Sequence, residues 1–286
     1  MTPSIPRISI EQVVGGYDAV LFDAYGVLIT HDGALPGAAA LIEHMNAAAK
    51  PFFILTNDAS RSVQSSAERY REMGLDIPGE RILTSGLLLE SYFKKKGLTG
   101  STCIVLGTED SAGYVRAAGG RIVSPDADTD AETVVVCDER GYPLRETLDH
   151  VVSFLYRRLD RGDSVHLILA NPDLVYPAGP KRYGLTAGSV AHTLSQVLEH
   201  RYPERGDLRF VPLGKPHRPM FEEAERRAGS RNLVMIGDQI RTDIRGANDF
   251  GIDSVLVPTG LARLEHLGDN TADLPAYILE TLEMNE

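Results

Sequence analysis

The sequence has few cysteines and no long apolar run. Among 286 residues only Cys103 and Cys137 are cysteines, and each lies in an apolar β-type run, where a small buried side chain is a better interpretation than a ligand or nucleophile. This usage indicates a reducing compartment. No stretch approaches the roughly 18 apolar residues that span a bilayer, and the first residues lack a basic segment followed by an apolar one. We therefore expect a cytoplasmic protein with no membrane partner.

Basic residues are scarce relative to acidic ones. The sequence contains 29 Lys and Arg against 40 Asp and Glu, which gives a formal net charge of -11. Such a charge disfavours a sequence-independent grip on nucleic acid, although a local basic pocket could still hold a small anion. The hydrophobic content of 43% is enough for the core of one large α/β domain or two modest ones. We expect a folded protein whose partner is a small molecule and not a nucleic acid.

Short β-branched apolar runs alternate with helical patterns along the chain. This alternation is typical of an α/β fold with a parallel sheet covered on both faces. A first βαβα unit ends near Gly74, and a second series of strands and helices begins after “RILTSG”. The simplest organisation is a Rossmann-like core domain formed by residues 1–86 and 179–286, interrupted by an inserted α/β cap domain over residues 87–178.

Polar side chains follow several of the predicted strands, at the edge where open parallel sheets bind ligands. They are Asp23 after “AVLF”, Thr56 and Asn57 after “PFFIL”, Lys215 after “FVPLG” and Asp238 after “VMIG”. Each one alone has an ordinary alternative as a cap, a turn or a surface corner. Together they predict a reaction centre. One carboxylate attacks, the other binds a divalent metal, the hydroxyl and the ammonium neutralise phosphoryl oxygens, and Asn57 orients the site.

The order “DAYGVL”, “LTND”, “GKP” and “GDQIRTD” resembles the four motifs of the haloacid dehalogenase (HAD) superfamily. The long insert between the second and third motifs, with “ANPD” and “TAGSVAHTL”, resembles class IIA, the nitrophenylphosphatase- and NagD-like branch. The resemblance covers nearly the whole chain. It implies a Mg²⁺-dependent phosphohydrolase that acts on a small phosphorylated metabolite through an aspartyl-phosphate intermediate.

The resemblance also implies a role for each motif residue. Asp23 would be the nucleophile that accepts the phosphoryl group, and Mg²⁺ would be bound by Asp23, the main-chain carbonyl of Tyr25 and Asp238. Thr56 and Lys215 would bind the phosphoryl group.

Three further acidic or amide side chains are candidates with open alternatives. Asp243 would support the water shell of the metal, or it is a helix N-terminal acid favoured by the macrodipole. Asn171 and Asp173 in “ANPD” would contact the substrate, and Asp173 could supply an acid; the alternative is an Asn-Pro-Asp turn that caps a strand. The cap domain would contact the leaving group and so determine substrate choice. A homodimer formed through the cap domain is a further hypothesis. Sugar phosphates, glycerol or glycolate phosphates, nucleotides and pyridoxal phosphate all stay open as substrates.

Tyr25 departs from the phosphatase pattern. In phosphatases of this superfamily the residue two after the nucleophile is usually an aspartate, which protonates the leaving oxygen and later deprotonates the attacking water. A positioned acid or base is typically worth about 10²–10⁴ in rate, and a phenol with a reference pKa near 10 replaces little of the base function at pH 7. We therefore expect weakened acid/base catalysis.

Two other functions are compatible with this motif. “DAYG” is closer to the 2-haloacid dehalogenases, in which an aspartate displaces halide. However, only about thirty residues separate Asp23 from Thr56, which leaves no room for the helical insert of those enzymes. “GDQIRTD” also keeps both acids of a metal site, which those enzymes do not need. A catalytically weak binding or regulatory protein on the same fold is the third interpretation.

Overall fold

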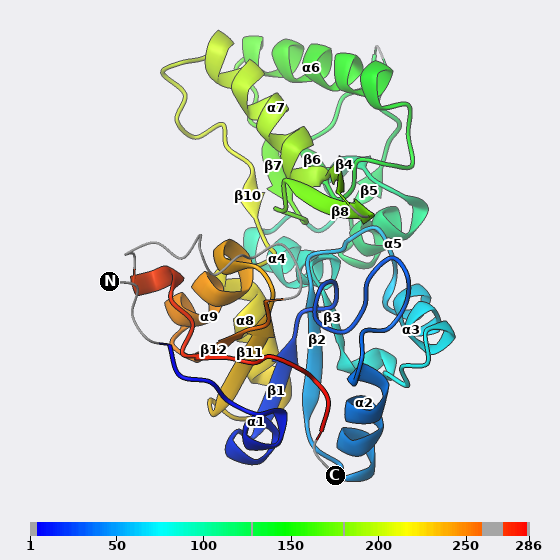
Figure 1. Ribbon diagram of the computed structural model, residues 1–286. Coiled ribbons are helices and arrows are strands. Elements are labelled where there is room, and N and C mark those ends of the chain that lie inside the picture. Colours follow the sequence, from blue (N-terminus) through cyan, green and yellow to red (C-terminus); the bar gives the residue numbers. More distant parts are fainter. Residues whose placement is uncertain (1–4, 127, 180, 259–270, 285–286) are drawn as a thin grey trace. The chain divides into compact units, whose positions relative to one another are not determined.

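The computed structural model describes residues 5–126, 128–179, 181–258 and 271–284 (Figure 1). Residues 1–4, 259–270 and 285–286 of the predicted core domain lie outside these ranges, as do residues 127 and 180. The chain divides into two compact units. The first consists of Met1–Thr56, Val63–Leu83 and Lys215–Glu286, and the second of Asn57–Ser62 and Thr84–Gly214.

The first unit is built on a six-stranded sheet with the strand order β13-β12-β11-β1-β2-β3 (Figure 1). Its strands are β1 (Ala19–Phe22), β2 (Phe52–Thr56), β3 (Ile82–Thr84), β11 (Leu233–Gly237), β12 (Asp253–Leu256) and β13 (Tyr277–Ile278). β1 pairs in parallel with β11 and β2, and β12 pairs in parallel with β11 and β13. β1, β2 and β11 are buried along their whole length, as expected for parallel strands covered on both faces.

Helices complete the core of the first unit. They are α1 (Ile10–Gly16), α2 (Ala38–Ala47), α3 (Val63–Glu72), α8 (Arg218–Ala228) and α9 (Arg245–Phe250), with the short helices η1 (Gly79–Arg81), η3 (Ile240–Ile244) and η5 (Thr271–Asp273). Since side chains alternate between the two faces of a strand, every second residue of β1, β2 and β11 shares one core with apolar residues of α1, α2 and α3. Phe221 of α8 stacks on Phe250 of α9.

The second unit has a sheet of its own, with the order β10-β7-β6-β4-β5, in which every neighbouring pair is parallel. The strands are β4 (Thr102–Leu106), β5 (Arg121–Ile122), β6 (Thr133–Val136), β7 (His166–Leu169) and β10 (Val211–Pro212). The helices are η2 (Ser85–Leu87), α4 (Leu88–Lys96), α5 (Glu109–Ala117), α6 (Leu144–Asp160) and α7 (Ala187–Arg201). β8 (Val175–Gly179) and β9 (Arg182–Leu185) form a separate antiparallel pair. Both units thus confirm the predicted α/β class.

The second unit differs from the predicted cap at its boundaries. The prediction ended the insert at residue 178, but Leu194 and Leu198 of α7 pack in the same core as Phe154 of α6. β10 pairs with β7 and not with the first sheet. The second unit therefore continues beyond residue 178, because α7 and β10 complete the second core, and the chain returns to the first unit only at Lys215. Within the described ranges, no helix is long and apolar enough to cross a membrane.

Candidate active site

Asp23 comes directly after β1, and two donors hold its carboxylate. Lys215 Nζ donates to Oδ1 at 2.7 Å, and the main-chain N–H of Ala24 donates to the same oxygen at 2.8 Å. Both Asp23 and Lys215 are buried. The residue predicted to be the nucleophile therefore has a fixed orientation beside a buried ammonium group.

The same ammonium group reaches a second acid. Lys215 Nζ donates to Asp243 Oδ1 at 2.7 Å, and Asp243 Oδ2 accepts from the main-chain N–H of Gln239 at 3.1 Å. Asp243 lies in η3, a five-residue π-helix, a geometry that is frequent at functional sites. The fully buried carboxylate thus caps the start of this helix and also binds Lys215.

Asp238, the first residue after β11, completes a cluster of three acids. One carboxylate oxygen from each of Asp23, Asp238 and Asp243 lies within 4.8 Å of the others, and all three residues are buried. With the three acids ionised and Lys215 protonated, the cluster has an excess of two negative charges. Carboxylate oxygens are the ligands that hard divalent cations prefer, so both the donor set and its charge fit an ion such as Mg²⁺.

The electrostatics of the cluster follow from this imbalance. Burial raises the pKa of the Asp243 carboxyl, the charge of Asp23 raises it further, and Lys215 opposes both. Burial by itself would lower the pKa of Lys215, but Asp23 and Asp243 outweigh it and hold that pKa above its ordinary value. Lys215 therefore stays protonated, but its single positive charge does not balance the negative charges of the three acids.

Two glycines allow this close packing of carboxylates. Gly26 has a φ of +92°, and a Cβ built on it would lie 2.4 Å from Asp238 Oδ2. A Cβ at Gly237 would lie 2.2 Å from the Cβ of Asp243. Sequence reasoning missed both glycines, although the glycine in “DAYG” and the one in “IGD” stand beside the predicted acids. Tyr25, which precedes Gly26, is half-buried and packs against the core of the first unit.

Thr56 and Lys215 both belong to the first unit, but they lie at or after the ends of strands from different sheets. Thr56 is the buried last residue of β2, which is a parallel neighbour of β1, so both strands end at the same edge of the sheet as Asp23. The sequence suggested that Lys215 follows a strand of this same sheet, but it does not. It follows β10, which belongs to the second sheet, and it is the first residue of the returning chain.

The remaining predicted residues meet in the second unit. Asn57 Nδ2 donates to Asp173 Oδ1 at 2.8 Å, and Asn171 Oδ1 accepts from the main-chain N–H of Asp173 at 3.0 Å. The carbonyl of Asp173 accepts from the N–H of Gly188 at 3.0 Å, at the start of α7. The geometry around Asn171 is that of a side-chain-stabilised turn, and Asn57 is bonded to that turn.

Comparison with known proteins agrees with this fold. A family model of haloacid dehalogenase-like hydrolases matches residues 20–121, and a HAD-hydrolase-like model matches residues 212–284. A crystal structure from Cytophaga hutchinsonii, described as a possible sugar phosphatase of the HAD superfamily, superposes with a TM-score of 0.85. Its sequence is 30% identical, and the match covers 99% of this chain and 100% of that one.

Two curated relatives are similar at lower identity. A dihydroxyacetone phosphatase of Corynebacterium glutamicum is 28% identical over 85% of this chain and 81% of its own length. A Caenorhabditis elegans protein that carries the NipSnap name is also 28% identical, over 87% of this chain, but the match spans only 49% of that protein. The chain thus spans about half the length of this longer relative.

The chain belongs to the haloacid dehalogenase superfamily, and it is a phosphatase. Its fold is similar to that of NagD from Escherichia coli, which is 21% identical and superposes with a TM-score of 0.76 over 94% of this chain and 98% of that one. The resemblance seen in the four sequence motifs is therefore confirmed. The roles of the individual site residues stay predictions and are argued below from their geometry.

Proposed function

We propose that this phosphatase hydrolyses a small phosphorylated metabolite through a phosphoryl group carried on Asp23. The observation that carries the proposal is the position of Lys215 Nζ, 2.7 Å from both Asp23 and Asp243 in one buried acidic cluster. A carboxylate held in place beside a cation is an oriented nucleophile, and the cation can neutralise charge on the oxygens of the group under attack.

Two displacements at phosphorus make up the reaction. In the first, an oxygen of Asp23 forms a bond to phosphorus while the ester P–O bond breaks, and the leaving oxygen departs with the electron pair. In the second, water attacks the phosphorus of the aspartyl-phosphate, the bond to Asp23 breaks, and inorganic phosphate leaves with the carboxylate restored. Thr56 and Lys215 would bind the phosphoryl oxygens in both steps.

The acidic cluster would hold Mg²⁺. Phosphatases of this superfamily depend on a divalent metal ion. Asp23, Asp238 and the main-chain carbonyl of Tyr25 would be its ligands, and Asp243 would orient its water shell. When bound, the cation would neutralise charge on the phosphoryl group.

Residues of the second unit would contact the leaving group and select it. Asp173 is hydrogen-bonded to Asn57, the residue next to Thr56, and together with Asn171 it would contact the substrate. The relatives named dihydroxyacetone phosphatase and possible sugar phosphatase support a triose or sugar phosphate as the substrate class, and a relative from Gallus gallus named glycerol-3-phosphate phosphatase supports a polyol phosphate. Since Tyr25 stands where these phosphatases usually have an aspartate, acid/base catalysis would be weakened.

Substitution of the nucleophile tests the proposal. Asp23→Asn keeps the shape of the side chain and removes the attacking charge, so hydrolysis of a panel of sugar, triose and polyol phosphates should fall by at least about 10³-fold. Circular dichroism and size-exclusion chromatography should show an unchanged fold. Halide release from 2-haloacids is measured in parallel. Phosphatase activity of the variant near that of the wild type would place the reaction at another site, and halide release by the wild type would support dehalogenation instead.

A further inference from the structure

The segment Asn57–Ser62 joins two elements of the first unit but belongs to the second. It connects β2 to α3, and both of these lie in the first unit. The chain therefore enters the second unit immediately after Thr56 and leaves it again before Val63. We call these residues the 57–62 segment. Whatever fixes its backbone also fixes the residue that follows the proposed phosphoryl-binding threonine.

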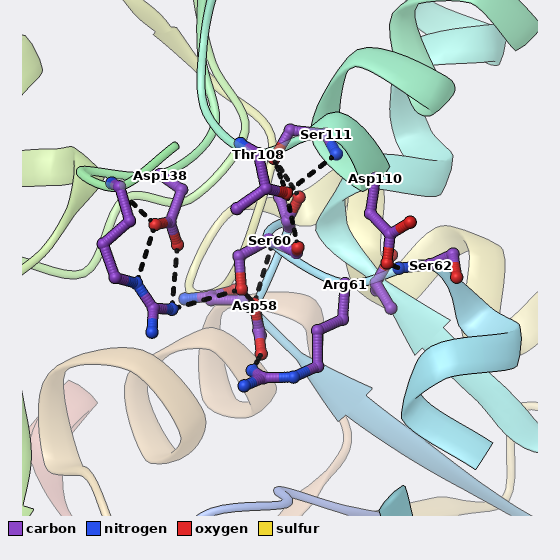
Figure 2. A network of polar contacts seen from close by, with 12 residues as sticks. Asp58, Ser60, Arg61, Ser62, Thr108, Asp110, Ser111 and Asp138 are labelled. Carbon is purple, nitrogen blue, oxygen red and sulfur yellow. Dashed lines mark hydrogen bonds and ion pairs between the residues drawn. The ribbon is translucent and has the colours of Figure 1, made fainter. Parts of the chain in front are cut away.

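Hydroxyl groups of the second unit hold four main-chain carbonyls of this segment. The donors and acceptors are Ser85 Oγ to Asn57 O at 2.9 Å, Ser111 Oγ to Ala59 O at 2.8 Å, Thr108 Oγ1 to Ser60 O at 2.6 Å, and Tyr114 OH to Arg61 O at 2.8 Å. In addition, the N–H of Ser62 donates to Asp110 Oδ2 at 2.8 Å. Figure 2 shows Thr108, Asp110 and Ser111 beside the segment.

Three of the four donors form a row on one helix. Thr108 is the N-cap of α5, and Ser111 and Tyr114 follow at intervals of three residues, so all three lie on the same helical face. Three consecutive carbonyls of the segment, those of residues 59, 60 and 61, accept from this row. We call the four donors, Ser85, Thr108, Ser111 and Tyr114, the hydroxyl row.

Residues of the hydroxyl row are buried and closely packed. Ser85 and Ser111 are fully buried, and a Cβ built on Gly86 would lie 2.4 Å from the ring of Tyr114. Burial raises the pKa of Tyr114 to about 12, so its phenol stays a neutral donor near pH 7. Because a buried carbonyl that loses its donor is costly, these bonds restrict the segment to one conformation.

Side chains within the segment restrict it further. Asp58 accepts from the N–H of Ser60 at 2.8 Å and from Arg61 at 3.0 Å, which closes a local turn (Figure 2). Arg140, which also binds the buried Asp138, reaches Ser60 Oγ at 3.4 Å. The segment is therefore fixed both internally and from α5.

We propose that the hydroxyl row consists of positioning residues for phosphoryl binding: it fixes the 57–62 segment, and through the adjoining peptide it fixes Thr56. The proposal rests on the proposed function, because it takes Thr56 as a phosphoryl ligand. None of the four donors is a catalytic residue. They act through the backbone of the segment, so their loss should weaken the binding of the phosphoryl group itself and not only the stability of the fold.

Removal of a single hydroxyl tests this. Tyr114→Phe deletes one donor and keeps the ring. We expect kcat/KM for p-nitrophenyl phosphate to fall about tenfold and the inhibition constant of inorganic phosphate to rise by a similar factor, since small displacements of a positioning group cost rate steeply. Tyr156→Phe is the matched control. It also removes a phenol that donates to a main-chain carbonyl of the second unit, that of Val197 at 3.3 Å, but one remote from the segment in sequence. Both variants should lower the melting temperature, and only Tyr114→Phe should change phosphate inhibition.

A second pair of variants separates the hydroxyl from the side-chain volume. Thr108→Ser keeps the donor and should keep the inhibition constant of phosphate within about twofold of wild type, whereas Thr108→Val should raise it as Tyr114→Phe does. If Tyr114→Phe and Thr108→Val melt earlier but are inhibited by phosphate like the wild type, the row is only structural and the proposal is wrong. That result is distinct from failure of the proposed function, which would appear as Asp23→Asn activity near wild type.

Discussion

At the scale of single residues, we expect Tyr25 to determine which leaving groups the phosphatase can release. A phenolate leaves without a proton, but an alkoxide does not, so the wild type should hydrolyse p-nitrophenyl phosphate far faster than alkyl phosphates. Tyr25→Asp should raise the turnover of alkyl phosphates at least about tenfold more than that of p-nitrophenyl phosphate. Because Tyr25 packs against the core, the change should also cost about 1–2 kcal/mol of stability.

Tyr25→Asn is the control for this prediction. Asparagine has the size of aspartate and cannot exchange a proton, so it relieves any crowding without restoring an acid. Steady-state kinetics on both substrates would compare the two variants. Equal gains in Tyr25→Asp and Tyr25→Asn would show that crowding explains the effect. Wild-type turnover of alkyl phosphates already above about 10 s⁻¹, a typical enzyme value, would mean that another group such as Asp173 supplies the proton.

The sequence patterns located the three acids of the cluster and Lys215, but they did not give the partner of Asn57. Asp23 and Asp238 could be placed because each follows a continuous apolar run, and such strands end at one edge of a parallel sheet. The bond of Asn57 to Asp173 joins residues 116 positions apart, and nothing in either local pattern specifies it. Its place after a strand assigned Asn57 to the reaction centre, and the structure adds that its amide is bonded to the “NPD” turn of the second unit.

At the scale of elements, the turn after β1 depends on Gly26. Alanine at this position would adopt a left-handed backbone and place a Cβ 2.4 Å from Asp238 Oδ2. Gly26→Ala should lose about 1–2 kcal/mol from the backbone alone. Because Asp238 must also move, the variant should lose most of the rise in melting temperature that Mg²⁺ produces. Differential scanning calorimetry with and without Mg²⁺ measures both effects.

Gly74→Ala provides the matched comparison. Gly74 follows α3 with a φ of +82°, and a Cβ there would meet nothing within 4 Å. The backbone cost should thus be similar, but the response to Mg²⁺ should stay that of the wild type. A full Mg²⁺ response in Gly26→Ala would show that Asp238 tolerates displacement and that the turn does not shape the metal site.

Element boundaries show where local patterns fail. The start of α7 was noted in the sequence only as “TAGSVAHTL”, and the spacing of its apolar residues does not specify which sheet it covers. Packing against α6 assigns it to the second unit. β10 has two residues and gives no periodicity, so its pairing with β7 decides its sheet. Thr108 and Ser111 of the hydroxyl row were missed because serine and threonine at a helix start have an ordinary role as caps.

At the scale of the whole molecule, metal binding should be visible as stability. A ligand that binds only the folded state stabilises it by mass action, by about 2.7 kcal/mol at a concentration of 100 times Kd. The excess negative charge of the acidic cluster should make Mg²⁺ such a ligand. The melting temperature should therefore rise with millimolar MgCl₂ by several degrees, and NaCl of equal ionic strength should not reproduce the rise.

Asp238→Asn tests the origin of that shift. It removes one negative charge from the cluster, so the metal-free variant should melt at or above the wild-type temperature while the rise with MgCl₂ becomes much smaller. A wild type that melts at the same temperature with and without millimolar MgCl₂ would count heavily against the metal-dependent phosphatase mechanism. Chemistry of the dehalogenase type, which needs no metal, would then gain support.

The strand order of the first sheet also bears on how the protein is made. β1 leaves the ribosome before its neighbour β11, which follows only after the whole second unit has been synthesised. Asp23 is therefore synthesised well before Lys215, Asp238 and Asp243, which all follow the second unit in the chain. A chain that ends before residue 215 contains Asp23 without its ammonium partner and without the other two acids. Such a chain lacks the acidic cluster, so we expect it to bind no metal ion at this site and to have no phosphatase activity.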